Sequence, residues 1–212
     1  MYKRQKELRA ELEDFGISFC THSDTEVLVN TIQLYGEKAL NKLRGMFGFA
    51  VWNEQEQSLM LARDFFGIKP VYYAEIDGHF VFASEIKSIL AFPGYERKVN
   101  QKALEQYLSF QYAPLEETFF KGIYKLMPGH VLIYRDGKYE IKSYFKARLT
   151  LGQWEESQEN SNVGTRRDEN VNELKENNPD MQPLQARLET ILDDSVKHHM
   201  LSDVEVGAFL SG

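Results

Sequence analysis

The sequence predicts an α+β fold in which helices and an antiparallel sheet form separate layers. Apolar residues first recur at helical spacing near the N-terminus, and from residue 46 the pattern changes to short β-prone runs separated by turn residues. Helical patterns return after residue 84 and precede a last hairpin. Helices and strands that are grouped in this way, rather than alternating, are typical of the α+β class.

Two amphipathic helices are expected first. Residues 5–15 place leucines and a phenylalanine on one helical face, and Gly16 follows where a helix usually stops. Ser23, with Glu26 three residues later, has the pattern of a capping box, and the apolar stripe that follows it continues to Gly36. We therefore expect the second helix to begin at Ser23.

The next elements are predicted to be strands. Met46–Trp52 is almost wholly apolar and too short for a typical helix, which favours a strand that is buried on both faces. Three short β-prone runs, 58–62, 71–74 and 79–83, are separated by turn residues and predict an antiparallel meander. Further patterns predict helices over 84–92 and 101–110 and a hairpin over 131–144.

The composition changes sharply over residues 151–183. This segment has 8 acidic, 3 basic and only 6 apolar residues, as a linker or a solvated insertion would. It carries -5 of the net charge of -7, so the acidic balance says little about a substrate. A helical stripe follows from Leu184, and an apolar strand is predicted over 204–210. A natural domain rarely ends on such a strand, so we expect an incomplete second domain.

The composition also disfavours several classes of protein. An excess of 32 acidic over 25 basic residues argues against a DNA or RNA partner. The single cysteine, Cys20, can build neither a disulfide framework nor a thiolate metal cage, and we expect it to be a buried structural thiol in a cytoplasmic protein that holds no metal. No run approaches the ~18 to 20 apolar residues of a membrane helix, so no membrane partner is expected.

Several ordered motifs point to a family. They are HSDTEV at 22–27, RGMFGFAVW at 44–52, ARDFFGIKP at 62–70, PGH at 128–130 and SDVEVGAFLSG at 202–212. Any one of them alone is a weak signal, but their order and separations agree. Together they resemble the glutamine-hydrolysing asparagine synthetases, which are ATP-dependent ligases.

The resemblance implies a fold and a domain organisation. It implies an N-terminal-nucleophile hydrolase-like αββα sandwich, incomplete here, followed by the first helix and strand of an α/β ATP-pyrophosphatase-type synthetase domain. The boundaries are then 1–149 for a truncated type-2 glutamine amidotransferase domain, 150–183 for the acidic linker or insertion, and 184–212 for the start of the synthetase domain, cut at its pyrophosphate loop. We expect the chain to be a fragment truncated at both ends.

The resemblance also implies a reaction. In the family, a cysteine at the N-terminus hydrolyses glutamine with its own α-amino group as base, and the ammonia attacks an aspartyl-adenylate made from aspartate and ATP with Mg²⁺. Residue 2 here is Tyr2. No catalytic residue is therefore assigned, and the chain alone is expected to be inactive and to need no cofactor. Its partners would be these small molecules, and a homodimer could form.

The resemblance singles out a few site residues. The aspartate of Ser-Asp-x-Glu, here Asp24, binds the α-amino group of glutamine in the family, although a first-turn aspartate also simply favours the helix dipole. Leu210, Ser211 and Gly212 are the remnant of the ATP-binding loop, and too little of that loop is present for ATP binding. Arg63 and Asp64 are expected to form a local ion pair, with support of the glutaminase face as the alternative.

Two rival functions remain open on the sequence. A domain without its nucleophile could be a non-catalytic module that pairs with and regulates a full-length relative. The same fold could also serve a relative that resembles β-lactam synthetase and makes a different amide bond without glutamine.

Overall fold

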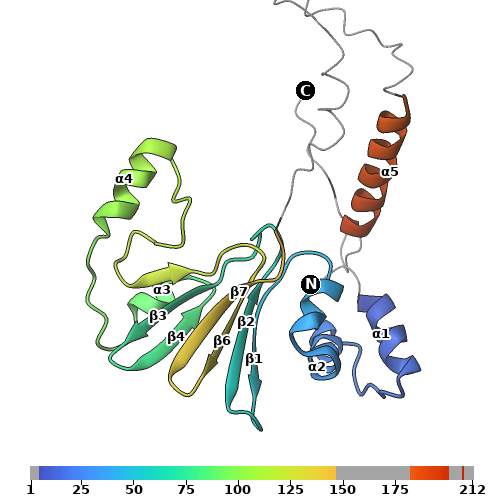
Figure 1. Ribbon diagram of the computed structural model, residues 1–212, viewed down its shortest axis with the longest axis horizontal. Helices are drawn as coiled ribbons and strands as arrows, with labels where there is room; N and C mark the ends of the chain where they lie inside the picture. Colours follow the sequence, from blue (N-terminus) through green and yellow to red (C-terminus); the bar gives the residue numbers. More distant parts are fainter. Residues whose placement is uncertain (1–4, 147–181, 201–206, 208–212) are drawn as a thin grey trace, which may run out of the picture. The chain divides into compact units, whose positions relative to one another are not determined.

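The computed structural model describes residues 5–146, 182–200 and Gly207. The chain divides into two units, Met1–Lys146 and Ala147–Gly212, and each is described by itself. The first unit contains both sheets and all but one of the described helices (Figure 1).

Helices open the first unit as predicted. α1 (Gln5–Asp14) and α2 (Asp24–Tyr35) lie within a residue or two of the expected bounds. A short 3₁₀ helix, η1 (Gly36–Lys42), continues directly from α2 and was not predicted. Leu8 and Leu12 on α1 are buried, as is Val27 on α2, but Phe15 is 62% and Leu34 42% exposed, so the predicted apolar faces turn inward only in part.

Seven strands form two antiparallel sheets, β1-β2-β6-β7 and β4-β3-β5 (Figure 1). The predicted meander is wrong, because β2 pairs with β6 and not with β3, which lies in the other sheet. The short strand β5 was missed, since a run this short carries little local pattern. The strands are β1 (Gly48–Asn53), β2 (Ser58–Arg63), β3 (Tyr72–Ile76), β4 (His79–Ala83), β5 (Ile123–Lys125), β6 (His130–Arg135) and β7 (Lys138–Ser143).

The first strand is less buried than the sequence predicts. β1 begins at Gly48 rather than Met46, and its residues alternate between exposed and half-buried up to Trp52, which is 50% exposed. Within the described residues β1 pairs only with β2, so it is an edge strand. Burial on both faces was therefore the wrong expectation for this strand.

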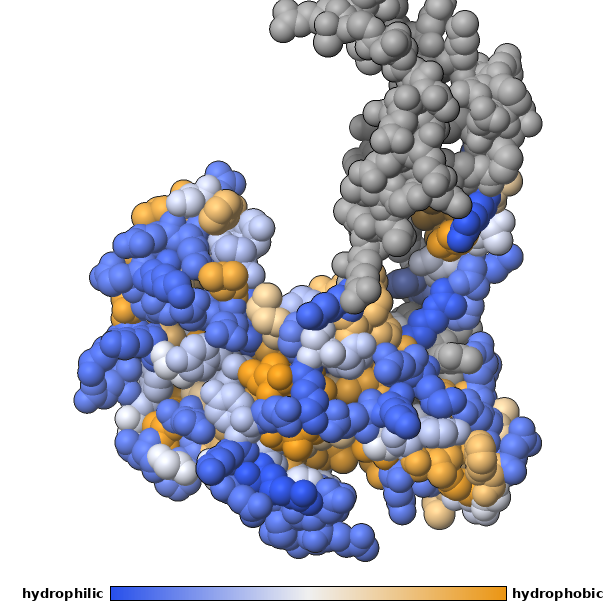
Figure 2. Space-filling model, in the orientation of Figure 1, coloured by the Kyte–Doolittle hydropathy of each residue, from blue (hydrophilic) through white to orange (hydrophobic). Residues whose placement is uncertain are grey.

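Two helices follow the strands. α3 (Ile86–Leu90) is shorter than predicted, whereas α4 (Gln101–Phe110) has the predicted bounds and an N-cap in which the Asn100 side chain accepts from the Ala103 N–H at 3.4 Å. Figure 2 shows apolar side chains exposed over α4. Among them, Leu108 is 73% exposed.

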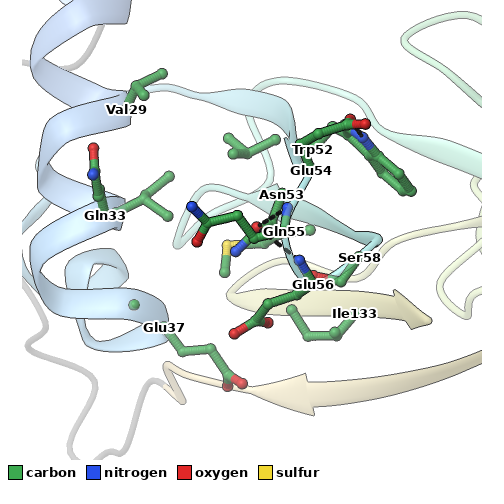
Figure 3. A pocket seen from close by; sticks show the side chains of 14 residues that line it. Val29, Gln33, Glu37, Trp52, Asn53, Glu54, Gln55, Glu56, Ser58 and Ile133 are labelled. Atoms are coloured by element: carbon green, nitrogen blue, oxygen red, sulfur yellow. Dashed lines mark hydrogen bonds between the residues drawn. The ribbon is translucent and has the colours of Figure 1, made fainter.

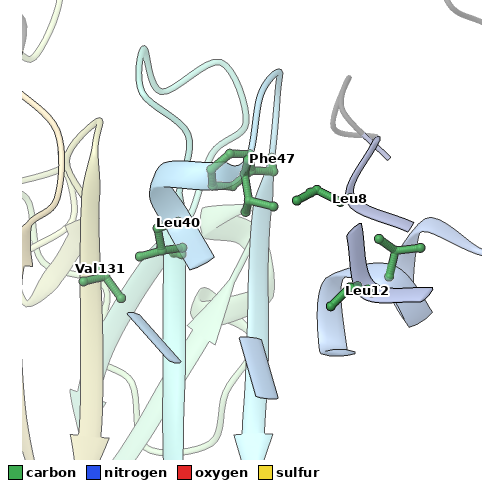
Figure 4. Packing of buried hydrophobic residues seen from close by; sticks show 8 residues of the cluster. Leu8, Leu12, Leu40, Phe47 and Val131 are labelled. Atoms are coloured by element: carbon green, nitrogen blue, oxygen red, sulfur yellow. The ribbon is translucent and has the colours of Figure 1, made fainter. Parts of the chain in front are cut away.

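Three apolar clusters order the layers. The first joins the helices to one face of the four-stranded sheet (Figure 4). The second lies between the two sheets and includes Leu61, Leu132 and Tyr73. The third packs α3, through Ile89, on the outer face of the three-stranded sheet. Helices, sheet, sheet and helix thus follow in the αββα order. The first cluster consists of Leu8, Leu12, Val27, Leu40, Leu43, Phe47, Ala62 and Val131.

The second unit is described by one helix, α5 (Gln182–His199), which confirms the helix predicted after Pro183. Leu188, Ile191, Leu192 and Val196 on it are exposed. Gln182 and Pro183, which begin α5, and Gly207 are described, and the rest of the predicted linker and of the strand predicted over 204–210 lies outside the described residues. Among the residues that are described, no helix is both long and apolar enough to span a membrane.

Candidate functional site

A pocket of about 300 Å³ opens beside the N-terminus of α2. Three segments far apart in the sequence build most of it: the first turns of α2, the start of β1, and the loop that leads into β3. Its walls are mostly apolar, and Asp24 and Lys69 are its only ionisable side chains. The lining residues are Asp24, Thr25, Leu28, Met46, Phe47, Gly48, Phe49, Lys69, Pro70 and Ser84.

Asp24 reaches this pocket because it is the first residue of α2. Ser23 is the N-cap, and its hydroxyl accepts from the Thr25 N–H at 3.1 Å. The cap fixes where the helix begins and leaves Asp24 half-buried at the pocket wall. An acidic residue in the first turn is also favoured by the positive end of the helix dipole.

Glu26 holds the loop that precedes α2. The sequence predicted a capping box, in which this carboxylate would reach the Ser23 N–H. Instead it accepts from the N–H groups of Cys20 and Thr21, both at 2.7 Å, and from the Thr21 hydroxyl at 2.5 Å. The hydrogen bond from the Thr21 side chain, followed by the one from the Cys20 backbone, lowers the pKa of Glu26 below its ordinary value.

Replacing Glu26 by glutamine is expected to lower stability in a pH-dependent way. A carboxyl whose folded pKa is depressed stabilises the protein above its unfolded pKa of 4.5, and this contribution is lost as the pH falls through the folded pKa. In thermal melts, the difference between Glu26→Gln and the parent chain should therefore be largest at about pH 7 and should shrink as the pH falls below 4.5. A difference that stays constant between these pH values would contradict the assignment.

Cys20 is exposed, so the expectation of a buried thiol is wrong. In the segment before α2, inward-facing and exposed side chains alternate. Ile17 and Phe19 pack against the first cluster, and Cys20 is exposed. Cys20 does not line the pocket at Asp24. The one thiol of the chain is therefore no substitute nucleophile there.

Arg63 and Asp64 do not have the local role that the sequence predicted. Rather than pairing mainly with each other, these consecutive side chains bind backbone groups, most of them within residues 66–69. The Arg63 guanidinium donates to the carbonyls of Lys69, Leu126 and Gly67 at 2.9, 2.7 and 2.6 Å. Desolvation lowers the pKa of Arg63, and the neighbouring Asp64 opposes that shift. The loop that carries Lys69 is thus fixed by its carbonyl groups.

Close backbone packing joins this loop to β1. A Cβ atom on Gly48 would lie 2.9 Å from Val71 Cγ2 and 3.3 Å from the Pro70 carbonyl oxygen. Only glycine therefore permits this approach without a shift of the loop. The Gly-Met-Phe and Gly-Ile-Lys-Pro motifs, which read locally as a strand and a turn, meet here to form one wall of the pocket.

A second, larger pocket of about 580 Å³ lies between α2 and the β1–β2 hairpin (Figure 3). Its carboxylates are engaged: Glu37 pairs with Lys142 at 3.2 Å and Glu56 with Arg135 at 2.9 Å. The Trp52 indole donates to Glu54 at 2.6 Å. This pocket contains none of the residues predicted for binding, whereas the smaller pocket contains Asp24, so the larger pocket is the weaker candidate.

The predicted ATP-binding residues and any metal-binding cluster were sought among the described residues. The described residues contain no group of three or more His, Cys, Asp or Glu side chains that could hold a metal ion. Leu210, Ser211 and Gly212, the predicted ATP-loop remnant, lie outside them. Of the residues predicted for binding, the structure therefore places only Asp24.

The sequence alone missed most of the other residues in this pocket. Lys69 was interpreted as a turn residue, and Ser84 as the start of a predicted helix rather than as a site residue. One signal in the sequence could have pointed to these residues, namely the order of the motifs. Segments that resemble one family in the same order are expected to come together in one fold. The pairing that joins them is long-range, and local patterns do not report it.

Comparison with known proteins gives a consistent result. Residues 2–145 match the family model described as a glutamine amidotransferase domain. The chain is 42% identical over 207 residues to asparagine synthetase [glutamine-hydrolyzing] 1 of Bacillus subtilis, covering 97% of this chain and 29% of the relative. It is 32% identical over 208 residues to asparagine synthetase 3 of the same organism, covering 98% of this chain and 30% of the relative. The chain thus spans less than a third of these relatives.

The fold resembles that of a solved enzyme. Glutamine phosphoribosylpyrophosphate amidotransferase from B. subtilis, in complex with ADP and GMP, superposes with a TM-score of 0.50 at 22% identity. The match covers 69% of this chain and 28% of the other. At this level of identity the likeness supports the α+β sandwich alone.

Proposed function

Because the chain belongs to the family of glutamine amidotransferase domains, we propose that the pocket at the N-terminus of α2 binds glutamine and that Asp24 binds its α-ammonium group. The observation that carries this proposal is the position of Asp24, in the first turn of α2 and in the wall of the pocket. A carboxylate paired with an ammonium group selects a free amino acid over a glutamine within a protein chain. The apolar side chains of Leu28, Met46 and Phe49 suit the aliphatic part of the ligand.

We further propose that the chain is the glutamine-using part of an asparagine synthetase, which makes asparagine from aspartate, glutamine and ATP. The identity to such enzymes over 97% of the chain supports this. Because the chain spans only 29% of that relative, the aspartate and ATP chemistry is assigned to the longer protein. Residues 184–212 would begin its synthetase domain, with Leu210, Ser211 and Gly212 at the ATP loop.

Glutamine hydrolysis needs a nucleophile, and the described pocket contains no thiol. The 212 residues are therefore proposed to bind and orient glutamine without cleaving it. A chimera supplies the missing groups: B. subtilis asparagine synthetase 1, with its matching segment replaced by this chain. Its glutamine-driven and ammonia-driven syntheses of asparagine can be measured separately.

In this chimera, Asp24→Asn is expected to raise the KM for glutamine roughly 10- to 100-fold, the effect of losing one charge-assisted hydrogen bond of ~1.5 to 3 kcal/mol. The ammonia-driven rate should stay unchanged, because ammonia does not need this pocket. Steady-state kinetics with each nitrogen source measure both quantities.

Asp14→Asn is the matched control, since Asp14 is an exposed aspartate at the end of α1. It should leave the KM for glutamine unchanged. N-acetylglutamine, which lacks the ammonium group, should be a poor substrate for the parent chimera. An equal KM for Asp24→Asn and Asp14→Asn would refute the proposed site.

A further inference from the structure

The buried carboxylate of Asp64 connects two separate segments of backbone. The residue is 1% exposed. Its Oδ2 atom accepts from the Phe47 N–H at 3.3 Å and from the Lys69 N–H at 2.9 Å, and its Oδ1 atom accepts from Phe66 at 3.2 Å and Ile68 at 2.9 Å. One acidic side chain thus satisfies four backbone donors.

Two of these donors belong to the two segments that form one wall of the candidate pocket. Phe47 lies just before β1 and Lys69 in the loop that leads to β3, and both line the pocket. They share the same carboxylate oxygen, Oδ2. A second bond, from the Asp64 N–H to the Phe47 carbonyl at 2.9 Å, strengthens the link to the β1 side. The position of the two segments relative to each other is therefore set through Asp64.

Arg63 restrains the same loop by donating hydrogen bonds to its carbonyl groups. Asp64 takes N–H groups of the loop, and Arg63 takes its carbonyls at Gly67 and Lys69. Lys69 is consequently held at both its N–H and its carbonyl. The Asp64 carboxylate is itself buried, so little water can replace a donor that it loses.

We propose that Asp64 is a positioning residue for the glutamine pocket: it holds the Phe47 and Lys69 segments together in one wall of the pocket without touching the substrate. This inference rests on the proposed function, because it assigns Asp64 to the same pocket. It predicts that Asp64 governs the affinity for glutamine and not the chemistry of later steps.

Asp64→Asn tests the proposal in the chimera described above. The asparagine keeps the size of the side chain but turns one acceptor oxygen into an N–H donor that faces backbone N–H groups. We expect the KM for glutamine to rise roughly 5- to 20-fold, the effect of losing one or two buried hydrogen bonds. The kcat with glutamine and the ammonia-driven rate should change by less than about twofold.

Ile89→Ala separates positioning from general destabilisation. Ile89 is fully buried in the third cluster and does not line the pocket. Ile89→Ala should lower the melting temperature at least as much as Asp64→Asn does, and it should leave the KM for glutamine unchanged. If both variants raise the KM equally, or if Asp64→Asn lowers only the melting temperature, the proposal is overturned.

Hydrogen exchange in the 212-residue chain gives a reading that does not depend on activity. In Asp64→Asn, the amides of Phe47 and Lys69 should both exchange faster, whereas those of β6 should not. Unchanged exchange of the Phe47 amide or of the Lys69 amide would overturn the proposal. An effect of Asp64→Asn on KM without one of Asp24→Asn would instead locate the failure in the proposed role of Asp24.

Discussion

Replacing Leu132 by alanine is expected to lower the free energy of unfolding by about 2 to 5 kcal/mol. Leu132 is fully buried on β6, between the two sheets, and lies opposite Leu61 in the register of β2 and β6. The shorter side chain would leave a cavity that two facing sheets cannot easily close. This is a large share of the ~5 to 15 kcal/mol that stabilises a typical domain.

Urea unfolding followed by far-UV circular dichroism measures this loss. Leu108→Ala on α4 is the matched control, since Leu108 is 73% exposed and its truncation should change stability by less than about 0.5 kcal/mol. Equal unfolding midpoints for the two variants would show that the second cluster does not stabilise the sandwich as its burial indicates.

Replacing Gly67 by alanine is expected to cost about 2 to 4 kcal/mol. Gly67 has a φ of +66°, which costs an L-residue ~1 to 2 kcal/mol. The new Cβ would also lie 2.7 Å from Pro128 Cγ and 3.0 Å from Arg63 Cζ, so the guanidinium that holds the loop would have to move. The loop carrying Lys69 should loosen, and stability should fall with it.

Gly137→Ala isolates the effect of the overlap. Gly137 has a similar φ of +72°, but nothing lies within 4 Å of its Cβ position. Gly137→Ala should therefore lower the free energy of unfolding only by the ~1 to 2 kcal/mol that a positive φ costs an L-residue. If chemical denaturation gives the same loss for both glycines, the close approach of Arg63 and Pro128 to Gly67 has no energetic weight.

Local chemistry made several elements predictable. The helix at 101–110 needs only its apolar spacing and the Asn100 cap, and the structure has both. The β6–β7 turn follows from Asp136 and Gly137, which adopt the positive φ values that a type I′ hairpin turn requires. The ordered motifs were also sufficient to indicate the family, because they depend on residue identity and not on contacts.

The candidate site was only partly predictable. Asp24 stands out in the sequence through its motif and its place after an N-cap. Phe47, Lys69 and Ser84 do not, because they reach the same pocket from separate segments. Asp64 looked like half of a surface ion pair until the fold showed that its carboxylate binds four backbone N–H groups.

Local sequence patterns predicted most of the helices, strands and turns, since those depend on neighbours within a few residues, but they missed η1 and β5. Only the tertiary structure decided that β2 pairs with β6, some 70 residues away, while β3 lies in the other sheet. It also decided that Cys20 is exposed and that β1 is an edge. Strand pairing and burial are set by contacts between distant residues, and an alternating apolar pattern is compatible with many such partners.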